Sequence, residues 1–256
     1  MDAIAQFKIN QKTAWAGFAA MEMLTCLAAP RLVRFAGVQR ASKVLDVASG
    51  TGVVALTAAR AGASVTGIDL TPELVAHAKE NAALSETEVK WLEGDAEDLP
   101  FGDGAFDIVV SQFGHMFAPR PEVVVREMLR VLRPGGTIAF ATWPPELLTG
   151  RMFAMMGRYS PAGPPPGVSP SPQWGDPNIV RERLGSAVKD IFFDRDAIKL
   201  PMLSPQYGRA FMERNVGPVT RLVKALDAEP EKLASFRRDM EELITLYFED
   251  NAMRQD

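Results

Sequence analysis

Several residue types on which other classes of protein depend are scarce in this chain of 256 residues. A single cysteine, Cys26, excludes an internal disulfide and a site built on clustered thiolates. Only two histidines are present, His77 and His115, so we expect no histidine-rich metal site and no bound metal. His77 falls on the predicted helix after Pro72 and is expected to lie at the surface.

Long runs of one kind of charge and long apolar runs are also missing. The net charge is −4 and no segment is rich in lysine and arginine, whereas a nucleic-acid partner would need a basic face. No stretch reaches about 18 consecutive apolar residues, so we expect no membrane span. Residues 1–10 contain the acidic Asp2 and no long apolar run, unlike a signal peptide. These absences favour a cytoplasmic protein.

The residues that are present alternate between strand-like and helix-like segments. A hydrophobic content of 47% is enough for the chain to bury one full core. Alternation of this kind predicts a parallel sheet with helices on both faces, and ligands of such sheets bind at the carboxyl ends of the strands. Thr71 and Pro72 favour a helix start, with a capping hydroxyl before a proline at the first helical position. The predicted strands cover residues 43–47, 64–68, 89–92, 107–111 and 136–142, and the predicted helices cover residues 52–61, 72–83 and 121–132.

The most informative segment runs from Val44 to Asp69. A short apolar run enters the turn Gly50-Thr51-Gly52, a helical stretch follows, and a second apolar run ends in Asp69. This unit is typical of sites for nucleoside-bearing ligands, because glycine lets the backbone approach the ligand and the helix presents its first N–H groups to it. An ionised carboxylate at Asp69 would accept hydrogen bonds from two ribose hydroxyls.

That unit alone leaves the ligand open, because the glycine turn and Ala55 also fit the G-x-G-x-x-A pattern of dinucleotide sites. Three further features favour another ligand. Asp46, four residues before the turn, suits a ligand with an ammonium group and would repel a pyrophosphate. Asp95 follows the third apolar run, where it can meet an adenine amino group. The segment Leu-Arg-Pro-Gly-Gly at residues 132–136 precedes the fifth apolar run.

Together these motifs resemble those of the class I S-adenosylmethionine (SAM) methyltransferases, especially the small-molecule branch similar to the ubiquinone and menaquinone C-methyltransferases. The resemblance is close from Lys43 to Thr142 and loose elsewhere, and Ala48 stands where the family usually has glycine. It implies an α/β, doubly wound, Rossmann-like fold with a seven-stranded, mostly parallel sheet. It also implies that SAM is the methyl donor and S-adenosylhomocysteine the product.

The resemblance further implies which residues hold the cofactor. Leu70 would pack on the adenine and Ala96 would offer a backbone N–H to the ring, while Ser111 and Gln112 would lie along the methionine arm. The full implied set is Asp46, Ala48, Gly50, Gly52, Asp69, Leu70, Asp95, Ala96, Ser111 and Gln112.

The expected reaction is in-line displacement of a methyl group from the sulfonium by a nucleophile on a small-molecule acceptor. No Asn-Pro-Pro-Tyr motif follows Ser111, which disfavours the enzymes that methylate amide or base nitrogens. The acceptor is expected to be small and rather hydrophobic, and the methylated atom stays open. An aromatic pocket is predicted from Trp15, Trp143, Tyr159 and Trp174, although each is also a candidate for plain packing.

His115 is the candidate catalytic residue, four residues after Ser111. Its imidazole would act as a general base near neutral pH, or as a donor that orients the acceptor. The alternative is a hydrogen-bonded, half-buried histidine with a structural role. A base is needed only if the acceptor must lose a proton during the transfer.

The flanking segments complete the predicted organisation of one integrated domain, monomeric or homodimeric. Residues 1–42 are expected to form helices that cover the cofactor, with Pro30 breaking the helical pattern, before the cofactor-binding core at 43–143. Residues 144–180 are expected to form a proline-rich lid. In the last segment, 181–256, residues 191–193 and 198–202 are predicted to form an antiparallel pair that closes the sheet, and the chain from Pro205 to its end is predicted to be helical. Continuation of the natural chain beyond Asp256 is left open.

Two rival functions remain. An NAD-dependent oxidoreductase would share the glycine turn, but it would leave Asp95 and the turn Pro134-Gly135-Gly136 unexplained. A SAM-binding regulatory or scaffold protein without turnover would share the binding residues and is harder to separate from an enzyme.

Overall fold

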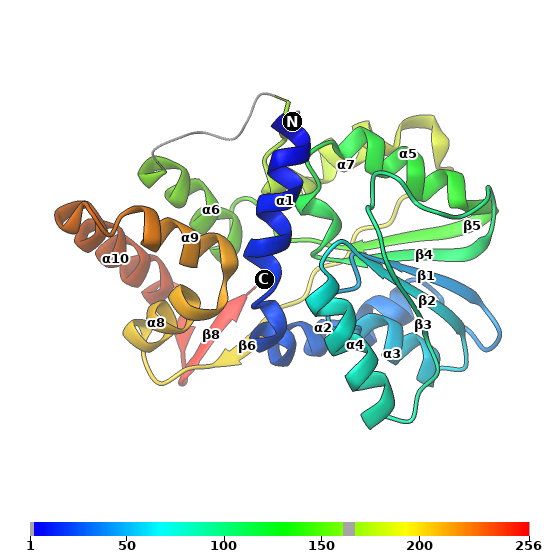
Figure 1. Ribbon diagram of the computed structural model, residues 1–256, viewed down its shortest axis with the longest axis horizontal. Coiled ribbons are helices and arrows are strands. Elements are labelled where there is room, and N and C mark those ends of the chain that lie inside the picture. The colour runs from blue at the N-terminus through cyan, green and yellow to red at the C-terminus, as the bar shows by residue number, and fades with distance from the viewer. Residues whose placement is uncertain (1–2, 161–166, 256) are drawn as a thin grey trace.

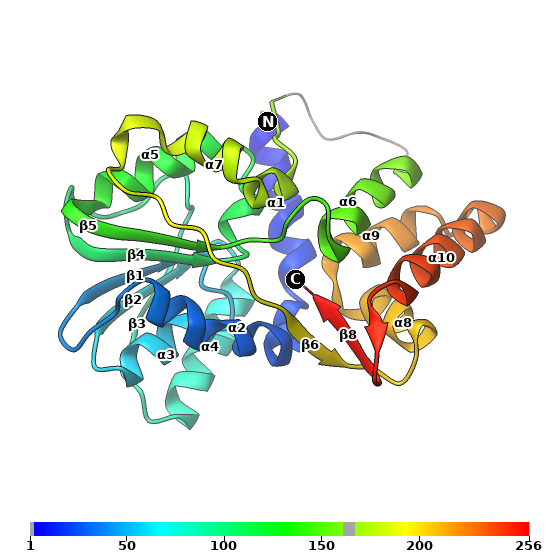
Figure 2. The same ribbon diagram turned by 180° about the vertical axis from the view of Figure 1, so that it is seen from behind.

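A computed structural model describes residues 3–160 and 167–255 (Figure 1). One half of the molecule is a sheet with helices around it, and the other half is a group of helices with a small second sheet (Figures 1 and 2). Helix α1 (Ala3–Trp15) lies between the two halves in both views.

The central sheet has five parallel strands in the order β3-β2-β1-β4-β5. Each of the five strands predicted from the sequence is present, and β5 begins four residues earlier than expected. The glycine turn follows β1 at the middle of this order. From β1 the chain adds β2 and β3 on one side, and it then returns from β3 to β4 on the other side of β1, so the turn lies at the switch point where ligands of such sheets bind. The strands are β1 (Lys43–Val47), β2 (Ser64–Asp69), β3 (Lys90–Glu93), β4 (Phe106–Gln112) and β5 (Leu132–Ala141).

Helices cover both faces of this sheet because successive strand residues point to opposite sides. Val44 packs in one cluster with helices α2 (Glu22–Phe35) and α3 (Val53–Arg60). Leu45 packs in another cluster, which contains Val124, Met128 and Val131 of α5 (Pro121–Val131). The predicted helices are confirmed as α3 (Val53–Arg60), α4 (Pro72–Leu84) and α5 (Pro121–Val131). Thr71 is the N-cap residue of α4 without a side-chain cap, and its N–H instead donates to Asp69 Oδ1.

The predicted break at Pro30 is wrong. After α1, a short 3-10 helix (Phe18–Met21) leads into α2 (Glu22–Phe35), which continues through Pro30. Ala29, Leu32 and Val33 of this helix are buried against the sheet, and this burial outweighs the one backbone hydrogen bond that proline removes. Among the described residues, no single helix is long and apolar enough to span a membrane, although α1 and Phe18–Phe35, bent by 62°, meet that test together.

The prediction of seven strands in one sheet is also corrected. In the described ranges, strands β6 (Ile198–Pro201), β7 (Phe248–Glu249) and β8 (Ala252–Gln255) form a separate antiparallel sheet in the order β6-β8-β7. The segment 191–193 is not a strand, and Phe192 is 77% exposed. A strand needs a hydrogen-bonded neighbour, and the chain end supplies one only to 198–201.

The prediction that the chain is helical to its end is also wrong, because its last residues pair with β6 and β7 as a strand. Helix α10 (Pro230–Thr245) is followed by a hairpin whose two turn residues, Asp250 and Asn251, have φ values of 51° and 55°. Two consecutive residues with positive φ are typical of the tightest hairpin turns, and aspartate and asparagine tolerate that conformation well. The Asp-Asn pair was the sequence signal for this hairpin.

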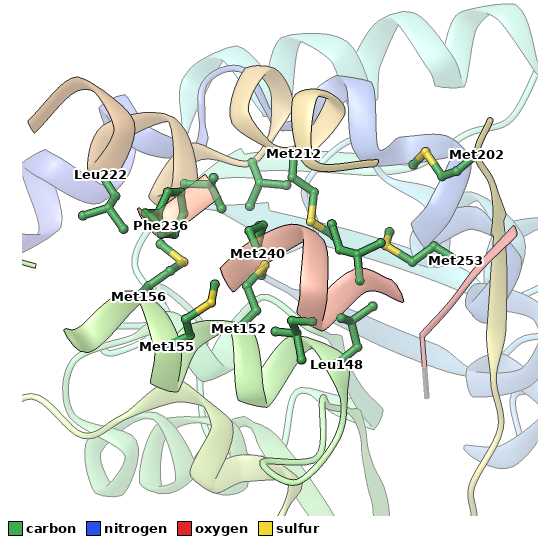
Figure 3. Close-up of a cluster of buried hydrophobic side chains, with 14 of the residues drawn as sticks. Leu148, Met152, Met155, Met156, Met202, Met212, Leu222, Phe236, Met240 and Met253 are labelled. Atoms are coloured by element: carbon green, nitrogen blue, oxygen red, sulfur yellow. The ribbon is translucent and has the colours of Figure 1, made fainter. Parts of the chain in front are cut away.

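The helical half has its own core, rich in methionine (Figure 3). Side chains from four helices of this half and from the small sheet meet there with Met21 and Leu24, and Met240 is fully buried among them. Methionine is flexible and fills irregular space, so this core tolerates changes in the shape of its surface. Besides α10, its helices are α6 (Leu148–Tyr159), α8 (Pro205–Asn215) and α9 (Gly217–Ala225); α7 (Pro177–Leu184) packs instead beside α5.

Candidate active site

The loop between β1 and α3 has a backbone that favours glycine. Gly50 and Gly52 have φ values of 56° and 86°, and a Cβ atom added at Gly52 would lie 2.5 Å from the ring of Trp91. Ala48 also has a positive φ, 55°, which is consistent with glycine being the usual residue there in the family that the sequence resembles. Ser49 is among the residues that line the cavity beside this loop, and its buried Oγ lies close to Gly67 and has no hydrogen-bond partner among the described residues.

Asp69 closes the loop from the end of β2. Its Oδ2 accepts the N–H of Gly50 at 2.8 Å, and its Oδ1 accepts the N–H of Thr71 at 2.9 Å. Burial raises the pKa of Asp69, and these N–H groups act in the opposite direction. The Thr71 side chain and the Leu70 backbone also hydrogen-bond to this carboxylate, whose two oxygens together can accept about four hydrogen bonds, and Asp69 and Leu70 both line the cavity.

Asp46 lies beneath the same loop and is only 1% exposed. Its Oδ2 accepts the N–H of Ala55 in the first turn of α3 at 3.0 Å. Burial raises the pKa of Asp46 to about 8, and the negative charge of Asp69 adds to this effect. A cationic group in the cavity would favour the ionised form of both carboxylates.

The buried state of Asp46 predicts how stability varies with pH. Between pH 3.8, the ordinary pKa of aspartate, and about pH 8, Asp46 is protonated in the folded protein and ionised in the unfolded chain. The contribution of Asp46 to the free energy of unfolding is therefore fully present below pH 3.8 and is lost as the pH rises to about 8. His115 has the opposite dependence on pH, because folding lowers its pKa from 6.5 to about 3. Its contribution to the free energy of unfolding is present above pH 6.5 and is lost as the pH falls below that value.

Between pH 6.5 and 8, therefore, the contribution of Asp46 falls while that of His115 is nearly complete. At about 1.4 kcal/mol per pH unit, Asp46 lowers the free energy of unfolding by up to about 2 kcal/mol over this range. Asp46→Asn should remove that part of the slope, which corresponds to roughly 4–8 °C in melting temperature. Thermal unfolding of the ligand-free protein at several pH values measures it. An equal slope in wild type and variant would contradict the assignment.

Asp95 lies after β3 and is covered by helix α1. Its Oδ1 accepts the N–H of Glu97, and its Oδ2 pairs with the Lys8 ammonium at 2.5 Å. Lys8 also pairs with Glu97 at 2.6 Å, and Lys12 pairs with Glu93 at 2.6 Å. Two lysines thus hold α1 against the edge of the cavity. Sequence reasoning did not find Lys8, because isolated lysines on a helix carry no signal of their partner.

The two residues predicted at the end of β4 have different surroundings. Ser111 is fully buried and does not line the cavity; its Oγ donates to the carbonyl of Val47 at 2.6 Å and accepts the N–H of His115 at 3.2 Å. It therefore connects β1, β4 and the turn that follows. Gln112 does line the cavity, and its Nε2 donates to the carbonyl of Thr25 at 2.8 Å.

His115 has surroundings that the sequence did not predict. The residue lines the cavity, but its side chain is fully buried between aromatic rings, stacked on Phe140 at 4.5 Å and edge-on to Trp174 at 4.5 Å. Neither ring nitrogen has a hydrogen-bond partner among the described residues. Burial, with a smaller effect from Arg183, lowers the pKa of His115 to about 3, so the imidazole is neutral at physiological pH.

The four aromatic residues predicted to wall a pocket separate into two pairs. Trp15 and Trp143 line the cavity; Trp15 packs on Phe117 at 4.6 Å, and Trp143 stacks on Phe113 at 4.0 Å. Tyr159 and Trp174 are not among the lining residues. The Tyr159 hydroxyl donates to Asp239 on α10, and Trp174 is buried behind His115.

The cavity continues from the strand ends into the helical half, and this part was missed from the sequence. Its walls come from segments far apart in the chain, so no local pattern joins them. The additional lining residues include Phe18, Met21, Phe117, Thr149, Met152, Phe153, Met212, Val216 and Gln255. No lysine or arginine of the described ranges lines the cavity.

Comparison of this chain with known proteins shows the family to which it is related. A family described as a methyltransferase domain matches residues 45–140. The uncharacterized protein Rv1403c of Mycobacterium tuberculosis is 36% identical over 226 residues, which cover 88% of this chain and 82% of that protein. The demethylmenaquinone methyltransferase of Staphylococcus aureus is 40% identical over 134 residues, covering 50% of this chain and 55% of that protein. The solved structure of the YcgJ protein from Bacillus subtilis matches with a TM-score of 0.58 at 20% identity, over 78% of this chain and 83% of that one.

The chain belongs to the class I SAM-dependent methyltransferases, in a family with Rv1403c. It is a SAM-dependent methyltransferase, and the rival functions of an NAD-dependent oxidoreductase and of a scaffold without turnover are not favoured. The site fits the cofactor of this family, because the glycine loop, the carboxylate of Asp69 and the carboxyl group of Asp46 all lie on one side of the cavity.

Proposed function

We propose that this methyltransferase acts on a small, uncharged, largely apolar acceptor that binds in the part of the cavity formed by the helical half. The observation that supports it most directly is the composition of the wall. Phe153 and Met152 of α6 and Met212 of α8 line it, with Trp15 and Trp143 at its sides. A charged acceptor would lose its hydration there without gaining a partner of opposite charge.

The same proposal assigns the cofactor to the other end of the cavity. Asp69 would hold the ribose, Asp95 the adenine amino group with Ala96 and Leu70 beside the ring, and Asp46 would lie near the cationic end. Gly50 and Gly52 allow the backbone to come close, and Ala48 extends the same loop. The bound cofactor supplies an activated methyl group, so the task of the protein is alignment, which contributes roughly 7–11 kcal/mol in favourable cases.

The organisation into 1–42, 43–143, 144–180 and 181–256 remains part of the proposal. Residues 161–166 of the expected lid lie outside the described residues. Within the described part of 144–180, α6 supplies three lining side chains. Gly150 and Gly175 both lie against the backbone of 143–145, where an added Cβ would come within 2.3 Å of a carbonyl oxygen, so these positions are tightly packed.

A transfer assay with isotope-labelled SAM tests the acceptor class. We expect 1-naphthol to be methylated with a kcat/KM at least tenfold above that of phenol, because its second ring buries more apolar area at about 25 cal/mol per Å². Phe153→Ala should remove most of this advantage and leave SAM affinity within threefold. Phe211→Ala is the matched control, since Phe211 packs in the same core without lining the cavity. Faster transfer to charged amines or amino acids would contradict the proposal.

A further inference from the structure

One polar group in the acceptor part of the cavity has no function yet. Gln112 is 91% buried and lines the cavity, and its Oε1 has no hydrogen-bond partner in the described part of the chain. Its Nε2 is held by the Thr25 carbonyl on α2, at 2.8 Å. A carbonyl only accepts, so this contact fixes the orientation of the amide and leaves the oxygen as the free atom.

A buried acceptor without a partner is unfavourable, and native structures seldom keep one without a reason. A ligand group that donates a hydrogen bond to Gln112 Oε1 would remove this cost on binding. Most other residues of the acceptor part are apolar, Phe113, Trp143 and Met152 among them, and the side-chain oxygens of Thr149 and Gln255 already share a hydrogen bond. Gln112 therefore distinguishes between ligands that carry a donor and ligands that do not.

The charge of the cavity restricts the class of donor further. Its charged lining residues are carboxylates, Asp46, Asp69 and Asp95, and they lie on the cofactor side. An acceptor with a carboxylate would meet like charge and no cation, and an acceptor with an ammonium group would be buried in an apolar wall. A neutral hydroxyl donates a hydrogen bond without either cost.

We propose that Gln112 is a specificity-determining residue for the acceptor, and that the acceptor is an uncharged aromatic compound with a hydroxyl group that donates to Gln112 Oε1. This inference rests on the proposed function, and it assigns Gln112 to the binding of the acceptor and no longer to the binding of the cofactor. A second polar pair on the same cavity wall, Thr149 Oγ1 donating to Gln255 Oε1 at 3.2 Å, brings α6 and the chain end to this subsite.

Binding of two probes to the full chain saturated with S-adenosylhomocysteine tests the inference. 1-Naphthol and naphthalene share their apolar rings and differ by one hydroxyl, and quenching of tryptophan fluorescence reports both, because Trp15 and Trp143 line the cavity. We expect wild type to bind 1-naphthol at least tenfold more tightly than naphthalene. Gln112→Leu should reduce this ratio to about threefold or less and leave S-adenosylhomocysteine affinity within threefold.

Gln206→Leu is the control, since residue 206 is exposed on α8 and does not line the cavity; its ratio should match wild type. Equal binding of the two probes by wild type, binding of neither, or an unchanged ratio in Gln112→Leu would overturn the inference. A tenfold loss of S-adenosylhomocysteine affinity in Gln112→Leu would return the residue to the cofactor set and overturn it as well. Failure of wild type to bind S-adenosylhomocysteine would instead overturn the proposed function. The wild-type comparison stands even if the variant does not fold.

Discussion

Asp69→Ala should weaken SAM binding by at least tenfold in titration calorimetry. Two effects add in the same direction. The variant loses the acceptor for the ribose hydroxyls, and hydrogen bonds to a charged group contribute about 1.5–3 kcal/mol each. It also releases the N–H groups of Gly50 and Thr71, which Asp69 holds at 2.8 and 2.9 Å, so the glycine loop loses its support.

Asp107→Ala separates this local effect from a general loss of stability. Asp107 also accepts a backbone N–H, from Lys43 at 2.8 Å, but it lies at the opposite end of the sheet and does not line the cavity. We expect its replacement to lower the melting temperature without changing SAM affinity by more than threefold. If Asp69→Ala binds SAM as wild type does, or if wild type binds NADH more tightly than SAM, the cofactor assignment is wrong.

His115→Ala should lower the free energy of unfolding by about 3 kcal/mol, as truncation of a buried aromatic ring does. The ring is fully buried and packs on Phe140 and Trp174, so its removal leaves a cavity that rigid neighbours cannot fill. Thermal unfolding should show a melting temperature lower by roughly 6–12 °C. A stable His115→Ala variant would contradict the packing role.

His115→Phe separates packing from chemistry, because it retains an aromatic ring and removes both nitrogens. With its pKa lowered to about 3, His115 is a poor general base at neutral pH, but a neutral imidazole still donates one N–H. We therefore propose that His115 orients the acceptor. His115→Phe should remain stable and lose about tenfold in turnover, equally at pH 6 and pH 8, which corresponds to one hydrogen bond.

Two other outcomes would change the role of His115. A loss of about 100-fold or more, with a wild-type pH profile that has a limb near pH 6–7, would support the general base. Unchanged turnover in His115→Phe would leave the residue with packing alone, and the acceptor would then need to be nucleophilic without help from this side chain.

The amino-acid sequence by itself determined the central sheet and the cofactor side of the cavity, where each feature depends on residues close to it in the chain. The five parallel strands follow from short apolar runs, the loop from Gly50 and Gly52, and the position of Asp46 and Asp69 from their places within or at the end of strands. These features depend on neighbours within about ten residues, or on the rule that parallel strands end at one edge.

Only the tertiary structure decided what closes the cavity and how its side chains behave. Lys8 and Asp95 are 87 residues apart, and the Gln112 amide is held by Thr25, also 87 residues away; no periodicity in the chain connects either pair. The partner of 198–201 is the chain end, so the seventh strand expected in the central sheet became part of a second sheet. The pKa of His115 depends on its burial against Phe140 and Trp174, which come from two other segments of the chain and reach His115 only when the protein folds.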